Sequence, residues 1–251
     1  MKRLRRVTEA EVISEFLKNE FYQEEFHRDR EKYEQLVMDA DVTDETENIL
    51  RKALLFRRRG HMWRELPADT QWWQVQIEPA DLNLIRVFPR AQWRKIAGGN
   101  FLLLDIVRRI RTERFSGRTR DFIAKVQALS YRLRVDSDSS SVLLIGVDET
   151  SPFTILEGNH RLTAALLASQ HILQNRFRVM CGFSPRMNES CWYETNVPNL
   201  WRYAKHRVQN LFGDKEADIE RILPVGTRAL SSGTTHYEPA VSTNKVLPGQ
   251  K

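Results

Sequence analysis

Apolar residues near the start of the chain recur at helical spacing in two segments. Between residues 9 and 21 they return every three to four positions, and a Thr-x-x-Glu sequence at 8–11 has the form of a capping box. A second helix is predicted over residues 44–60, ending at Gly60, because glycine is typical just beyond a helix C-terminus. The arginine run at 57–59 is then interpreted as positive charge in the last helical turn.

The middle of the chain changes from a strand pattern to a series of helical stripes. Residues 72–77 are rich in strand-forming residues and end in alternation, so we predict a strand there. Glycines at 98–99 and 117 break the region that follows. The predicted helices are a turn at 80–85, a short helix over 88–97, and two longer ones carrying the apolar stripes at 103–110 and 122–129.

The hydrophobic pattern in the second half of the chain predicts buried strands around one helix. A polar loop at 136–141 leads into a continuous apolar run, which is typical of a strand buried on both faces. The predicted order is strand 142–147, strand 153–156, a connector at 157–160, helix 161–173, strand 176–181 and a helix over about 200–212.

These patterns favour an α+β fold with a small mixed sheet and packed helices. We divide the chain into a helical N-terminal region at 1–66 and a sheet domain at 67–225, with a basic helical insertion at about 98–134. Residues 226–251 are predicted to be a disordered tail, because Ser, Thr, Gly and Pro replace any periodic apolar pattern there.

Charge is unevenly distributed along the chain. The 39 Lys and Arg exceed the 33 Asp and Glu by six, but residues 86–134 alone hold 13 basic against 3 acidic residues. This segment predicts a surface that attracts nucleotides, phosphates or nucleic acid, with solvated helix faces as the alternative.

Several classes of protein are excluded by what the sequence lacks. There is no apolar run of about 18 residues, so we predict no membrane-spanning helix and no membrane partner. Two cysteines, Cys181 and Cys191, are too few for a disulfide framework or a four-ligand zinc site, and we predict no metal site formed by the chain. The absence of an apolar stretch near the N-terminus argues against a signal peptide, so we expect a cytoplasmic protein.

The connector Glu157-Gly158-Asn159-His160-Arg161 carries the most chemical information. It lies between a predicted strand and a predicted helix, and a helix N-terminus presents unpaired N–H groups that attract phosphate. Gly158 permits a sharp bend and a close approach of ligand to the backbone. Glu157 is the lone carboxylate of this connector, placed to hold a metal, a ribose hydroxyl or a substrate proton.

This segment resembles the ParB/sulfiredoxin-like superfamily, whose signature has the form D/E-G-x-H-R. The resemblance covers roughly residues 72–183, with strands at 72–77, 142–147 and 177–181 where the family has strands. It implies a nucleotide-binding protein that acts as a phosphotransferase (kinase) or a nucleotide hydrolase. The implied cofactor is a nucleoside tri- or diphosphate, namely ATP, ADP or CTP, with or without Mg²⁺, beside an unidentified small-molecule co-substrate.

The resemblance also implies roles for particular residues. Glu157 and His160 are the candidate catalytic residues, and arginines from the basic segment are candidates to close over the anion. The implied phosphate contacts are Gly158, Asn159, His160, Arg161 and Thr163, and the further cationic contacts are Arg90, Arg94 and Arg118.

Other interpretations of the same residues remain open. The connector has no cysteine, which argues against sulfiredoxin chemistry, and no acidic residue follows Phe88 where the family's small-molecule kinases carry one. A Fic-type AMP transferase needs a histidine that is missing before Phe153. The alternatives kept are an ordinary strand-to-helix turn, a DNA-associated ParB-like protein that uses the basic stretch at 86–134, and an adaptor that retains the fold without catalytic activity.

Overall fold

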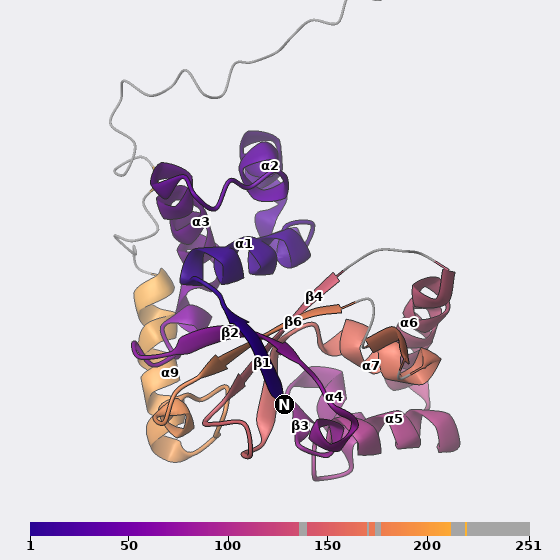
Figure 1. The fold of residues 1–251 in the computed structure, drawn as a ribbon. Coiled ribbons are helices and arrows are strands. Elements are labelled where there is room, and N and C mark those ends of the chain that lie inside the picture. Colours follow the sequence, from indigo (N-terminus) through magenta and orange to yellow (C-terminus); the bar gives the residue numbers. More distant parts are fainter. Residues whose placement is uncertain (136–139, 170, 174–176, 212–218, 220–251) are drawn as a thin grey trace, which may run out of the picture.

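The fold is a six-stranded mixed sheet with helices on both faces (Figure 1). The computed structural model describes residues 1–135, 140–169, 171–173, 177–211 and 219. The order of strands across the sheet is β1-β2-β6-β4-β5-β3. The α+β class predicted from the sequence is therefore confirmed.

Parallel and antiparallel pairs are combined in this sheet. β6 is parallel to β4 and β3 is parallel to β5, whereas β1–β2, β2–β6 and β4–β5 are antiparallel. The strands are β1 (Lys2–Arg6), β2 (Gln71–Gln76), β3 (Ile85–Val87), β4 (Ser140–Gly146), β5 (Phe153–Glu157) and β6 (Phe177–Phe183).

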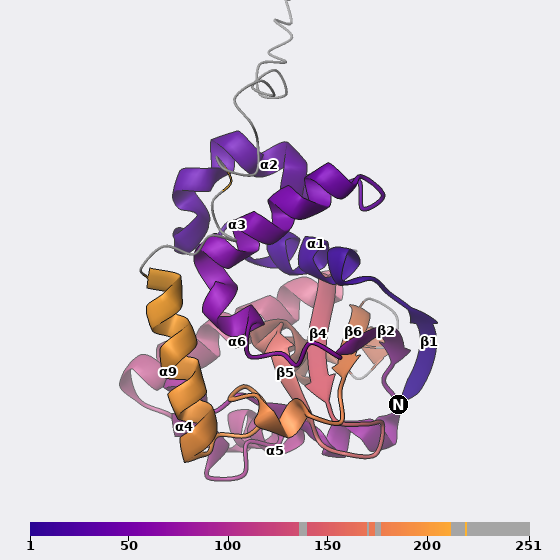
Figure 2. The ribbon, with the colours of Figure 1, turned by 90° about the vertical axis from the view of Figure 1, so that its left-hand side faces the viewer.

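The helices form two groups around the sheet. Figure 1 shows α1–α3 above it and α4–α7 on its other side, while α9 lies along one flank (Figure 2). The α-helices are α1 (Glu9–Glu20), α2 (Arg30–Met38), α3 (Glu45–Trp63), α4 (Ala91–Ala97), α5 (Leu103–Thr112), α6 (Gly117–Val135), α7 (Asn159–Ala168) and α9 (Val197–Leu211), with short 3₁₀ helices η1 (Glu24–Asp29), η2 (Pro79–Asn83) and η3 (Met187–Glu189).

Alternation along the central strand β4 separates two hydrophobic cores. Val142 and Leu144 pack with α4–α7, whereas Leu143 and Ile145 pack with α1–α3. All four side chains are fully buried. This explains why the sequence shows a continuous apolar run: a strand covered on both faces has no polar side to alternate with.

The N-terminal region differs from the predicted helical unit because it begins with a strand. β1 pairs with β2, with Lys2 opposite Gln76, and it forms one edge of the sheet. The side chains of all five of its residues are exposed, so the segment carries no alternating apolar signal from which a strand could be predicted.

Helix α3 begins where the sequence indicates, because Asp44 caps it, but its predicted end at Gly60 is wrong. The helix continues to Trp63, and the burial of Met62 and Trp63 in the core provides the reason. The arginines at 57–59 also do not serve as free C-terminal charges, since each of them makes an ion pair with a carboxylate of another segment.

For the second half of the chain, the structure confirms the predicted order of helices and strands but corrects their bounds. Helix α7 begins at Asn159 and ends at Ala168, so it is shifted from the predicted 161–173. Ser140 and Ser141 belong to β4, not to the predicted polar loop. Residues 136–139 of that loop and the predicted tail at 226–251 lie outside the described residues.

None of the helices within the described ranges is both long and apolar enough to cross a bilayer.

Candidate functional site

The N-terminus of α7 is the centre of the candidate site. β5 ends at Glu157, and Gly158 takes a left-handed conformation, with φ of 98°, before the helix starts at Asn159. The helices α1 and α3 have their first N–H groups capped by Thr8 and Asp44, whereas α7, like α2, α4 and α5, has no side-chain cap among the described residues. The first N–H groups of α7 are therefore free of a capping side chain, as an anion site requires.

Gly158 is required at this bend. A Cβ atom there would lie 3.1 Å from Cγ2 of Val142, and the positive φ is unfavourable for any residue with a side chain. The backbone of Gly158 is still used, because its carbonyl accepts the N–H of Leu162 as the first bond of the helix. The strand, the bend and the helix thus form one rigid unit.

We expect Gly158→Ala to lower the free energy of unfolding by roughly 1–3 kcal/mol, because strain and a tight contact add at one residue. Gly99→Ala is the matched comparison, since Gly99 also has a positive φ but no atom would approach its Cβ within 4 Å. Urea denaturation measures both variants. Equal losses for the two would contradict the steric part of this explanation.

A cavity of about 220 Å³ lies against this helix N-terminus. Its walls come from α1 and the segment after it, from α3, from the start of α4, from the connector and from Trp192. The lining residues are Phe16, Glu20, Gln23, Glu25, Arg59, His61, Met62, Arg90, Trp93, Leu156, Glu157, Gly158, Asn159, His160 and Trp192.

The two arginines of this cavity differ in their partners. Arg59 is neutralised by Glu20 and Glu25, each with an oxygen 2.9 Å from its Nη2. Arg90 lies 5.8 Å from the ring centre of Trp192 and, within the described ranges, forms no ion pair. The charge of Arg90 helps to lower the pKa of Glu25, but without a direct ion pair its guanidinium is the cation of the cavity better placed to meet a bound anion.

Two buried polar atoms near the cavity lack partners. Among the described residues, Oδ1 of Asn159 and Nε1 of Trp192 have no hydrogen-bond partner, and the two residues are only 8% and 7% exposed. Both residues line the cavity. Because buried polar atoms in folded proteins almost always find a partner, this pair points to a ligand that supplies one.

Glu157 lies in a network that joins α7 to α1. Arg161 forms an ion pair with it, and Nη1 of Arg161 donates to Oδ1 of Asn19 at 2.6 Å. Nδ2 of Asn19 donates in turn to Oε2 of Glu157 at 3.0 Å and to Ser141. Arg161 is not among the residues lining the cavity, so this guanidinium orients Glu157 instead of facing the space at the helix N-terminus.

Burial raises the pKa of Glu157 from its ordinary value of 4.5 to about 7, with a smaller contribution from the nearby charge of Glu20. Arg161 and the hydrogen bond from Asn19 oppose this shift. A carboxyl group with a pKa near neutrality both accepts and releases a proton at physiological pH, as a general base requires. The catalytic role of Glu157 stays a prediction, and the raised pKa is the property that such a role needs.

His160 lies beside two aromatic rings. Its ring centre is 5.4 Å from that of Trp93 and 5.1 Å from that of Phe122. Although part of His160 is exposed, the protein groups packed around its ring remove water from it and lower its pKa, and the charges of Arg90 and Arg161 lower the pKa further. The imidazole is therefore neutral at pH 7, and what it offers a ligand is a hydrogen bond without a full charge.

The other predicted contacts lie apart from the cavity. Thr163 is buried and its hydroxyl donates to the carbonyl of Asn159 at 2.7 Å, inside the helix. Arg94 donates to the carbonyl of Pro89 at 2.7 Å. Arg118 is exposed and, like the other two, does not line the cavity.

Sequence reasoning missed the part of the site that comes from the N-terminal helices. Glu20, Glu25, Arg59 and His61 all line the cavity. His61 has a pKa lowered to about 4 by burial and by neighbouring arginines, so it is neutral at pH 7. The sequence feature that points to this part of the site is the arginine run at 57–59, which the sequence pattern alone assigns to charge at a helix end.

Part of the basic segment stabilises the fold. Arg111 and Arg134 donate to carbonyls at the C-terminal end of α7, with distances of 2.8 Å to Leu166 and 3.4 Å to Ala168. Cations at this end of a helix satisfy free carbonyls and favour the helix dipole. Not all of the positive charge of this segment is therefore available to a ligand.

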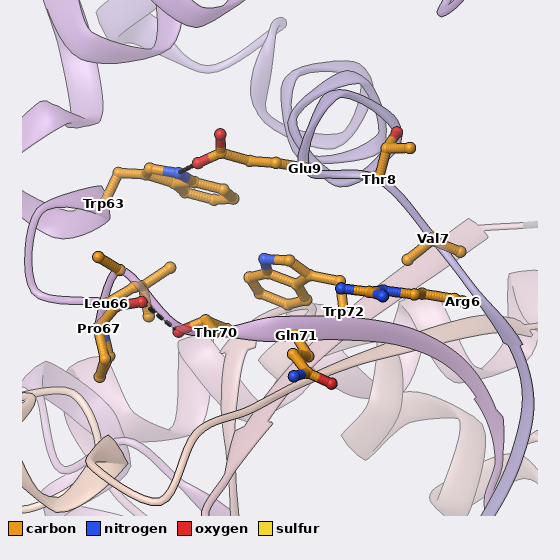
Figure 3. Close-up of a pocket in the computed structure, with 11 residues that line it drawn as sticks. Arg6, Val7, Thr8, Glu9, Trp63, Leu66, Pro67, Thr70, Gln71 and Trp72 are labelled. Carbon is orange, nitrogen blue, oxygen red and sulfur yellow. Dashed lines mark hydrogen bonds between the residues drawn. The ribbon is translucent and has the colours of Figure 1, made fainter.

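A larger cavity of about 580 Å³ lies where β1 and α1 meet β2 (Figure 3). The indole rings of Trp63 and Trp72 are nearly parallel there, with centres 6.0 Å apart. Nε1 of Trp63 donates to Glu9, and Thr70 donates to the carbonyl of Pro67. Since these polar groups are satisfied within the protein, the smaller cavity is the better candidate for chemistry.

Within the described residues, no group of three His, Cys, Asp or Glu side chains is arranged to hold a metal ion. When the chain was compared with known proteins, no family model, no curated protein and no solved structure matched it.

Proposed function

We propose that this protein binds a nucleoside di- or triphosphate at the N-terminus of α7 and transfers or hydrolyses its phosphoryl group. The observation that carries this proposal is the uncapped helix N-terminus opening on a cavity that also contains Arg90. Backbone N–H groups and an unpaired guanidinium are the donors that phosphate oxygens require. Membership of the ParB/sulfiredoxin-like superfamily is part of the same proposal.

The size of the cavity limits which part of the ligand enters. Its 220 Å³ is below the roughly 300–1,000 Å³ typical of a site for a whole drug-sized ligand. The phosphates therefore occupy the cavity, and the ribose and base lie at its mouth. A location in a reducing compartment such as the cytoplasm belongs to the proposal, in keeping with the free thiols of Cys181 and Cys191.

In the proposed reaction Glu157 is the general base. A water molecule or a substrate hydroxyl gives its proton to the Glu157 carboxylate. At the same time, the oxygen of that water or hydroxyl forms a bond to the terminal phosphorus, and the bond from this phosphorus to the bridging oxygen breaks. The leaving nucleoside di- or monophosphate keeps that bridging oxygen and the electron pair of the broken bond. Arg90 and the amides of α7 stabilise the charge on the phosphate oxygens, and the neutral His160 ring donates a hydrogen bond.

Mg²⁺ would enter with the nucleotide. It commonly binds through substrate phosphates together with one or two carboxylates and water. Glu20 and Glu25 of the cavity are already paired with Arg59 and are not free to bind the ion. The proposed reaction therefore includes no step at a metal ion.

A thermal-shift panel tests the proposed function. ATP, ADP, CTP and GTP are compared with adenosine and cytidine, each with and without Mg²⁺. Binding to the folded state alone at a hundredfold excess over the dissociation constant stabilises it by about 2.7 kcal/mol, so at least one phosphorylated ligand is expected to raise the melting temperature. No shift with any nucleotide, or equal shifts with the unphosphorylated nucleosides, would contradict the proposal.

A second candidate function is binding of a nucleic acid backbone by the basic segment. The side chains of Arg108 on α5 and Arg120 on α6 are 70% and 73% exposed, which favours contact with an extended polyanion, although each is already paired with a neighbouring carboxylate, Asp105 and Asp121. Such binding falls steeply with salt. DNA affinity that does not change between low and moderate salt would exclude it.

A further inference from the structure

Helix α9 exposes its apolar side chains. Val197, Trp201 and Leu211 are 79%, 78% and 71% exposed, and Val208 is 53% exposed. An amphipathic helix on the surface of a protein ordinarily turns such residues inward. Figures 1 and 2 show α9 along the flank of the molecule, where it packs on α3.

The opposite face of α9 is polar and already engaged. Nδ2 of Asn199 donates to the carbonyls of Asn188 and Glu194, both at 2.8 Å. His206 pairs with the buried Glu65 at 2.7 Å. The ring of Tyr203 on the same face packs edge-on against His61 and Trp192, with ring centres 5.8 Å apart in both pairs. The helix is therefore held by this inward face, and the apolar residues named above lie outward.

The exposed apolar residues follow a regular spacing. Val197, Trp201, Ala204, Val208 and Leu211 are separated by four, three, four and three residues, and all five are exposed. This is the a/d spacing by which one helix packs along another. We call these five residues the α9 stripe.

Charge around the stripe selects the partner. α9 contains no Asp or Glu, and Lys205 and Arg207 lie on the two sides of the stripe. We propose that the α9 stripe binds an amphipathic helix of another protein, with apolar residues at a/d spacing and acidic residues flanking them.

Two other occupants fit these observations less well. A second copy of α9 would bring Lys205 and Arg207 close to like charges, which is unfavourable across a helix pair. A helix lying in a membrane surface ordinarily has a broad apolar face, whereas the α9 stripe is widened beyond the a/d positions only by Leu200, which is 46% exposed.

A labelled synthetic helix of about three heptads, with leucine at the a/d positions and glutamate beside them, tests the proposal. Fluorescence anisotropy with the full-length protein is expected to show saturable binding that weakens as salt rises. Val208→Glu is expected to reduce the affinity roughly tenfold or more, because it places a charge within the stripe. Gln209→Glu adds the same charge outside the stripe and is expected to retain binding.

Failure of the glutamate-flanked helix to bind, or equal binding of a lysine-flanked version, would overturn the proposal. So would a wild-type dimer in sedimentation that Val208→Glu converts to a monomer, because the stripe would then bind a second copy. Binding to vesicles of phosphatidylcholine and phosphatidylserine that is lost in Val208→Glu would assign the stripe to a membrane instead. An unchanged melting temperature shows that Val208→Glu still folds.

Discussion

Replacing Arg90 with alanine is expected to weaken nucleotide binding roughly 10- to 100-fold. This range corresponds to the loss of one charged hydrogen bond, worth about 1.5–3 kcal/mol. The guanidinium lines the cavity and, within the described part of the chain, pairs with no carboxylate; Glu25, on which its charge acts, keeps Arg59 as its direct partner when Arg90 is removed. Isothermal titration with the nucleotide that gives the largest thermal shift measures the effect.

Arg118→Ala is the matched control for this experiment. Arg118 lies in the same basic segment but does not line the cavity. We expect its removal to leave the affinity nearly unchanged. Equal losses from the two substitutions would indicate that the overall positive charge, and not the cavity, attracts the nucleotide.

Replacing Glu157 with glutamine is expected to change how stability depends on pH. The folded protein holds the pKa of this carboxyl at about 7, whereas the ordinary value is 4.5. Between these values the folded state binds more protons than the unfolded state, so the contribution of Glu157 to stability is complete below pH 4.5 and is lost as pH rises through 7. The difference between the wild type and Glu157→Gln should therefore shift in favour of the variant from pH 5 to 8, by up to a few kcal/mol.

Urea denaturation at several pH values between 5 and 8 measures this difference. Comparison with the variant is needed because His61, with a pKa lowered to about 4, gives the opposite slope: its stability contribution grows as pH rises toward 6.5. Glu113→Gln is the control, since an ion pair with Arg109 lowers the pKa of Glu113 and keeps it ionised throughout. A constant difference between wild type and Glu157→Gln across this range would contradict the raised pKa.

The connector could be predicted from the sequence because its signals are local. A continuous apolar run, a glycine and a new helical period together predict a strand, a bend and a helix. The bend at Gly158 and the placement of Glu157 and Asn159 on the cavity followed from these signals. The helix starts two residues earlier than predicted, with Asn159 as its first residue.

The rest of the cavity could not be predicted because it depends on contacts between distant segments. Glu20, Arg59 and Trp192 are brought together only by the packing of α1, α3 and the segment after η3. The same limit applies to Arg161, whose charge suggested a phosphate contact but whose partner is Asn19. The local sequence pattern indicates the helix, strand or turn in which a residue lies, but the partners of that residue depend on the tertiary fold.

The basic strand β1 shows a further limit of periodicity. An edge strand with every side chain exposed has no buried face, and charged residues at such an edge also discourage pairing with other chains. The sequence Lys2–Arg6 therefore contains little that distinguishes it from a solvated terminus.

The most direct test of phosphate binding at α7 is to follow backbone amide resonances by NMR while inorganic phosphate and then the preferred nucleotide are added. The amides of Asn159 and His160 are expected to shift saturably, while those of Thr46 and Glu47, which Asp44 already caps at the start of α3, stay in place. Resonances at Asn159 and His160 that do not move at saturating nucleotide would contradict the central claim.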